Sequence, residues 1–175
     1  MSNNNEINVR LKQAIHYICH FAGKNDLTLG SIRLQKILFH ADREFYSRYF
    51  RALTQDAYIK GQNGPYQEDV QFAVEQLQKE RVLSVKKSKS HGELTKYSAR
   101  KPPVTEFTPE ECSLLDRWTK EICEENTSIG VSEATHNAVW RMAQMKEPIP
   151  LAAQMIGNSY PPTKEDWEWA EKVSS

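Results

Sequence analysis

The chain of 175 residues carries 23 lysines and arginines and 23 aspartates and glutamates, which gives a formal net charge of zero at pH 7. A single domain of this size hides about 70% of the surface that its unfolded chain exposes, so it needs no disulfide or metal to build a core. The balanced charge excludes a bulk electrostatic attraction to nucleic acid or to an anionic membrane. Any electrostatic function must therefore be local.

The cysteines and the N-terminus indicate a reducing compartment. Cys19, Cys112 and Cys123 are odd in number and form no CxxC pair, so we expect buried thiols and a cytoplasmic location. Residues 1–6 are polar and Asn-rich, which predicts a disordered segment rather than a secretion signal. No stretch approaches the roughly 20 apolar residues that a membrane span requires, so we expect no membrane partner.

Apolar residues recur at spacings of three and four along much of the chain, which predicts helices with one buried face. The predicted helices span residues 7–22, 26–49, 65–81, 109–124 and 132–145, with a short sixth helix from Thr163. Asp26 or Thr28 is expected to cap the second helix, and Pro65 to open the third, because proline presets the first helical φ. Thr108 and Glu111 have the capping-box spacing at the start of the fourth.

Strand signals are few and short. Residues 57–59 predict a strand before a turn at 61–65, and the alternating segments 82–85 and 94–97 predict a β-hairpin. The expected fold class is therefore α+β, a mostly helical single domain of about six helices with a small antiparallel β-hairpin or sheet. Residues 158–175 are expected to form an aromatic and acidic tail, whose tryptophans either pack on the domain or mark an interface.

Several motifs follow one another in a specific order: an LQK helix, an aspartate, a GP turn, and a histidine with a downstream tryptophan. They comprise residues 34–43, Leu53, Thr54, Tyr58, 63–65, 131–136 and Trp140. Together they resemble the Panacea domain, also called the SocA-like antitoxin domain, over roughly residues 7–157. The sequence departs from the family pattern at Phe50 and Gln55, where turn glycines are expected, and at His40, where an aromatic residue is commoner.

The resemblance implies a compact helical domain that serves as the antitoxin of a bacterial or prophage toxin–antitoxin pair. Such a protein would neutralise its cognate toxin, expected to be the product of the adjacent gene, by direct protein contact. The candidate partner-binding residues are Lys36, Asp42, Gly64, Pro65, Lys86, Lys87, Lys89, His136 and Trp140. The last two are four residues apart, a spacing that predicts stacking of the two rings and favours a structural role.

A winged-helix-like DNA-binding regulator is the alternative function. Six basic residues fall in or beside the predicted hairpin and follow a helix: Lys86, Lys87, Lys89, Lys96, Arg100 and Lys101. A basic wing of this kind contacts DNA phosphates. The preceding helix carries Glu68, Asp69, Glu75 and Glu80, and these acids would repel the phosphates, so nucleic acid is not the favoured partner.

We find no pattern typical of an enzyme, and we expect no cofactor and no metal. His16, Cys19 and His20 lie within about one helical turn, but a zinc site needs further ligands that the sequence does not supply. No cysteine occupies a turn that would activate its thiolate. Asp42, with the two charged residues after it, is expected to lie on a solvated helical face. The oligomeric state is left open.

Overall fold

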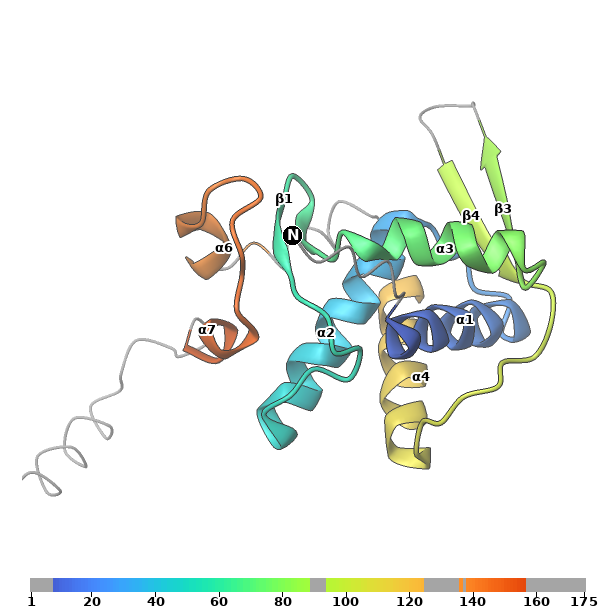
Figure 1. Cartoon of the computed structure of the whole chain (residues 1–175), viewed down its shortest axis with the longest axis horizontal. Helices are drawn as coiled ribbons and strands as arrows, with labels where there is room; N and C mark the ends of the chain where they lie inside the picture. The colour runs from blue at the N-terminus through green and yellow to red at the C-terminus, as the bar shows by residue number, and fades with distance from the viewer. Residues whose placement is uncertain (1–7, 89–93, 125–135, 137, 157–175) are drawn as a thin grey trace, which may run out of the picture.

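The computed structural model describes residues 8–88, 94–124, 136 and 138–156 (Figure 1). These residues form six helices: α1 Val9–Lys24, α2 Ser31–Tyr49, α3 Asp69–Lys79, α4 Pro109–Glu124, α6 Ala138–Met142 and α7 Leu151–Ile156. They also form two antiparallel two-stranded sheets: β1 Ile59–Gly61 with β2 Gly64–Tyr66, and β3 Leu83–Ser88 with β4 Leu94–Ala99. The expected mostly helical α+β domain is confirmed.

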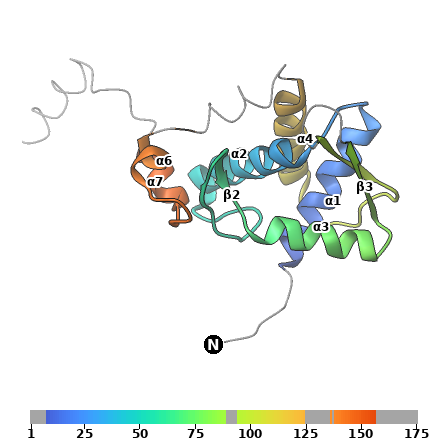
Figure 2. The same cartoon turned by 90° about the horizontal axis from the view of Figure 1, so that it is seen from above.

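The longest helix, α2, lies between two hydrophobic cores. Its Leu34, Ile37 and Leu38 pack into a main core shared with α1, α3 and α4. Its Phe39 packs on another side against Tyr58, in a smaller core that includes residues from the segment at α7. Figures 1 and 2 show α2 running between the α1–α3–α4 group and the α6–α7 end of the molecule. Seven consecutive residues of α2, 36–42, are consequently buried.

The expected cap of α2 is wrong, and the reason is a long-range contact. The helix begins at Ser31 with Gly30 as its N-cap, rather than at Asp26 or Thr28. The preceding residues are extended because the Leu29 carbonyl accepts a hydrogen bond of 2.9 Å from the Tyr97 amide of β4. A side chain at Gly30 would lie 2.8 Å from the backbone of β4, so this approach requires glycine.

By contrast, the start of α4 is confirmed in atomic detail. The Glu111 amide donates to Thr108 Oγ1 at 3.2 Å, and the Thr108 amide donates to Glu111 Oε2 at 2.9 Å. These reciprocal bonds satisfy two donors at the helix start. On the inner face of this helix, Leu114, Leu115 and Ile122 are buried and Trp118 is partly buried.

The expectation that Pro65 opens a helix is wrong. Pro65 lies in β2, opposite Lys60 of β1, and α3 begins only at Asp69. Gly64 turns the chain into this strand with a φ of 98°, a conformation that glycine adopts without steric cost. The first strand is also shifted from the predicted 57–59 to Ile59–Gly61.

The predicted β-hairpin is confirmed as β3–β4, with Val85 opposite Tyr97 and Lys86 opposite Lys96. Near the C-terminus, α6 occupies part of the predicted helix 132–145, of which 132–135 and 137 are outside the described residues. The helix α7 was not predicted, and it begins directly after Pro150. The segment 1–6, Lys89, the tail 158–175 and its helix from Thr163 also lie outside the described residues.

The departures from the family pattern have clear structural consequences. Phe50 and Gln55 both adopt left-handed backbone conformations, with φ of 53° and 56°, so the loop keeps the geometry for which glycine is suited. His40 stacks on the ring of Trp118, with 4.6 Å between the ring centroids. The imidazole therefore occupies an aromatic environment, and burial lowers the pKa of His40 to about 4.

Candidate functional site

The LQK motif of α2 holds the β1–β2 hairpin in place. Gln35 forms a pair of 3.0 Å hydrogen bonds with the backbone of Gln67, donating to its carbonyl and accepting from its amide. Lys36 Nζ donates to the Pro65 carbonyl at 3.3 Å. Buried backbone groups at the edge of a sheet need hydrogen-bond partners. Here the side chains of Gln35 and Lys36 supply these partners in place of a third strand. We call this contact the hairpin clamp.

Asp42 extends the clamp into the protein interior. Its Oδ1 accepts a hydrogen bond of 2.8 Å from the Thr54 amide, and its Oδ2 accepts from the Thr54 hydroxyl. Oδ2 also accepts from the Tyr58 hydroxyl at 2.7 Å and from Gln67 Nε2 at 3.3 Å. The Asp42 carboxylate thus links α2 to the loop that follows it, to Tyr58 just before β1 and to Gln67 just after β2.

The predicted solvated face at Asp42 is wrong, because α2 is covered there by the second core and the carboxylate is fully buried. Burial raises the pKa of Asp42 to about 6, while the hydrogen bonds from Thr54 and Tyr58 act in the opposite direction. Its donors stabilise the ionised form. Asp42 therefore has a structural role, because its hydrogen bonds hold several segments of the chain together.

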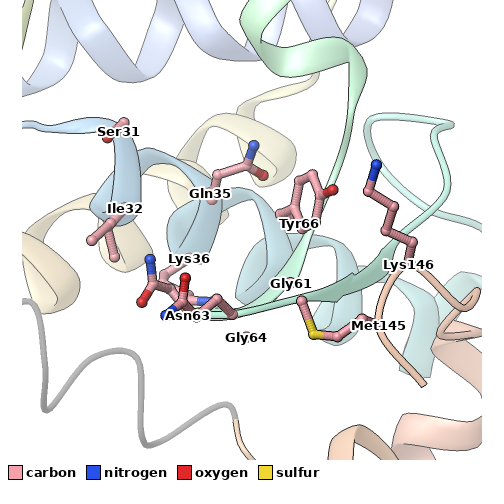
Figure 3. A pocket seen from close by; sticks show the side chains of 11 residues that line it. Ser31, Ile32, Gln35, Lys36, Gly61, Asn63, Gly64, Tyr66, Met145 and Lys146 are labelled. Atoms are coloured by element: carbon pink, nitrogen blue, oxygen red, sulfur yellow. The ribbon is translucent and has the colours of Figure 1, made fainter. Parts of the chain in front are cut away.

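A pocket of about 320 Å³ opens beside the clamp (Figure 3). Figure 3 shows side chains from the first turns of α2 on one side and Met145 and Lys146 on the other, with the hairpin between them. The lining residues are Ser31, Ile32, Gln35, Lys36, Gly61, Gln62, Asn63, Gly64, Tyr66, Met145 and Lys146. These lining residues, all within the described part of the chain, include two lysines and no acidic residue.

Lys36 is the unusual member of this lining. Its side chain is buried, at 2% exposure, yet it forms no ion pair within the described part of the chain. Burial lowers the pKa of Lys36 to about 7. The clamp therefore contains an amine that is easily deprotonated and that borders an open pocket.

The α6 region covers the other side of the hairpin. Trp140 Nε1 donates to the Gly61 carbonyl at 3.2 Å, and Lys60 Nζ lies 4.2 Å from the centre of the Trp140 ring. His136 stacks on Trp140 with 3.7 Å between ring centroids, which confirms the expected stacking. The Lys60 backbone also exchanges 2.9 Å hydrogen bonds with the segment at Lys146. The hairpin is thus held between α2 and α6.

The structure separates the predicted site residues into two groups. Lys36, Asp42, Gly64, Pro65, His136 and Trp140 all belong to the clamp or to its α6 cover. Lys86 and Lys87 are exposed on β3, outside the pocket lining, and Lys89 is outside the described residues. Sequence reasoning missed Gln67 and Gln35 as site residues. The matched LQK motif was the available signal for Gln35, and no motif marked Gln67.

The residues of the histidine and cysteine cluster of α1 make contacts away from the clamp. His16 Nε2 contacts the Lys101 carbonyl at 2.9 Å, and Cys19 is fully buried, which raises the pKa of its thiol. Within the ranges that the structure describes, no three His, Cys, Asp or Glu residues are grouped as metal ligands. None of the described helices has the length and apolarity needed to span a membrane.

The fold and the site define a helix-rich α+β domain in which a buried polar clamp holds a short hairpin beside a lysine-lined pocket. The family model described as antitoxin SocA-like, Panacea domain, matches residues 34–141. The chain belongs to this SocA-like antitoxin family. The match begins at the clamp helix and ends directly after Trp140, so it contains both sides of the hairpin. No curated protein and no solved structure matches the chain.

Proposed function

We propose that this protein is the antitoxin of a bacterial or prophage toxin–antitoxin pair and neutralises its cognate toxin by direct contact. The observation that carries the proposal is the family match to residues 34–141. The buried clamp supports it, because the motif residues Lys36 and Asp42 build a frame and leave the adjoining surface for a partner. The toxin is expected to be the product of the adjacent gene, in the cytoplasm.

We place the toxin-binding surface around the β1–β2 turn and the α6 segment. Met142 and Met145 are 86% and 60% exposed, and Met145 lines the same pocket as the exposed turn residues Gln62 and Asn63. Methionine side chains adapt to varied partner shapes and are enriched in binding surfaces. Gly64, Pro65, His136 and Trp140 support this surface, while Lys86, Lys87 and Lys89 of the β3–β4 hairpin are a second candidate contact.

Co-expression with the adjacent gene product tests the proposal, with growth rescue and co-purification as readouts. The double variant Met142→Asp, Met145→Asp is expected to abolish both, because it places two charges in the proposed interface. Val104→Asp is the matched control, since Val104 is 89% exposed but lies between β4 and α4. Charge reversal at Lys86 and Lys87 tests the second contact. Absence of both rescue and complex with the unmodified chain would reject the antitoxin function.

A DNA-binding regulator remains the second candidate function. Its supporting observation is that α3 leads directly into β3–β4, where Lys86, Lys87 and Lys96 are exposed. The exposed acids Glu68 and Asp69 at the start of α3 oppose it, because they would repel phosphates. Gel retardation with DNA from the protein's own locus at low salt decides the matter, and no retention there would remove this candidate.

A further inference from the structure

The charge of the clamp pocket is unbalanced. Among the residues that the structure describes, Lys36 and Lys146 line it and no acidic side chain does. An ammonium group has three donors, and in the described part of the chain Lys36 Nζ has one acceptor, the Pro65 carbonyl at 3.3 Å. A buried cation is costly unless it is paired and hydrogen-bonded. When protonated, Lys36 is therefore a cation whose hydrogen-bonding capacity is not filled by the residues that the structure describes.

The first turn of α2 adds a second favourable feature for an anion. Ser31 and Ile32 line the same pocket, and the N-cap Gly30 provides no side-chain acceptor for the first amides of this 19-residue helix. No acidic residue lies in that turn. Amide donors at a helix start carry partial positive charge and bind anions. Residues of the helix start and Lys36 thus line the same small volume.

We propose that the clamp pocket binds a carboxylate, and that its occupant in the antitoxin complex is an acidic side chain that the toxin inserts. This inference rests on the proposed function and names the chemistry of the partner. A single buried ammonium matches the single charge of a carboxylate. Ile32, Tyr66 and Met145 supply apolar contact for the aliphatic stem of such a side chain. The exposed Met145 at the rim joins the pocket to the proposed toxin-binding surface.

The carboxylate site is tested on the full chain by nuclear magnetic resonance with two matched probes, N-acetylglutamate methylamide and N-acetylglutamine methylamide. The acidic probe is expected to give saturable shifts at the amides of Gly61 and Gly64 and at the Lys36 side chain. The amide probe is expected to bind about tenfold more weakly or not at all. Lys36→Met should abolish the response, whereas Lys120→Met, at an exposed lysine of α4 outside the pocket lining, should leave it unchanged. Equal responses to the two probes, or no response to either, would overturn the site.

Measuring the affinity of the chain for the toxin tests whether the toxin supplies the carboxylate. Lys36→Met is expected to weaken the complex with the adjacent gene product by about tenfold or more, and Lys120→Met, at an exposed lysine of α4 outside both candidate contacts, is the charge-matched control. Probe binding combined with an unchanged toxin affinity would overturn the toxin as occupant. Failure of the unmodified chain to bind the toxin would reject the proposed function and the assigned occupant. The probe experiment would still decide whether the pocket binds carboxylates.

Discussion

Replacing Lys36 by methionine tests whether the clamp contains an amine that prefers to be neutral. Burial lowers the pKa of Lys36 from its ordinary value of 10.5 to about 7. In the unfolded chain the amine stays protonated up to its ordinary pKa, whereas in the folded protein it loses its proton above about pH 7. Between these two values the unfolded state therefore binds more protons, and stability must rise with pH.

The magnitude follows from the same two pKa values. The difference in bound protons between the unfolded and the folded state, integrated from pH 7 to pH 9, raises the free energy of unfolding by about 2 kcal/mol. The methionine variant lacks this contribution. At pH 7 the variant also avoids the cost of burying the lysine amine, which is about 4 kcal/mol from the same two pKa values. Against this, it loses the hydrogen bond to the Pro65 carbonyl, which contributes about 1–2 kcal/mol. We expect Lys36→Met to be the more stable protein at pH 7.

Urea unfolding followed by circular dichroism at a series of pH values measures both effects. The decisive quantity is the difference between wild type and Lys36→Met, because groups shared by the two proteins cancel. Among the titratable neighbours, the pKa of His40 is lowered to about 4 by burial, so His40 stays neutral throughout this range. Lys146, on the pocket rim, is exposed. A difference that is constant from pH 7 to pH 9 would refute the reasoning.

Four further substitutions test the frame of the domain by urea unfolding. Tyr58→Phe removes the 2.7 Å hydrogen bond to Asp42 and is expected to lower the free energy of unfolding by about 1.5–3 kcal/mol; no loss would mean that the carboxylate finds another donor. Gly64→Ala should lower the free energy of unfolding by about 1–3 kcal/mol, because the φ of Gly64 is 98°. Gly23→Ala is the control: Gly23 lies in open space within α1, so alanine should raise the free energy of unfolding by about 0.5–1 kcal/mol. A change of the same sign for both variants would contradict this. Thr108→Ala should cost about 1 kcal/mol through the lost capping box, and a cost near zero would show that the cap is dispensable.

Features set by neighbouring residues could be predicted from the sequence. The capping box of Thr108 and Glu111 is an example, since both of its bonds form within one helical turn. The β3–β4 hairpin is another, because its alternation and polar loop are contained in one short segment. Phe50 and Gln55 were identified as glycine-like positions by comparison with the family pattern, and their backbone is left-handed.

Features set by distant contacts could not be predicted. The start of α2 depends on Leu29 pairing with β4, about seventy residues away in sequence, which no local cap signal contains. Pro65 is a frequent first residue of helices, but here the bond from Lys36 holds it in a strand. Asp42 was expected in solvent because a charged residue beside an apolar face is usually solvated. Its burial follows from the second core, whose residues 149–151 come more than a hundred positions later.

Under the proposed function, the clamp separates the frame of the domain from the surface that meets the toxin. The residues that identify the family, from Lys36 and Asp42 to Trp140, have their polar groups turned inward to the hairpin and to one another. The exposed rim at Met142 and Met145 consists of residues outside those motifs. Under the proposed function, rim residues can change without loss of the buried network, because their side chains contribute little to the core. We expect, under the proposed function, that the exposed rim determines which toxin is bound, while the buried Lys36 contacts an acidic side chain of that toxin.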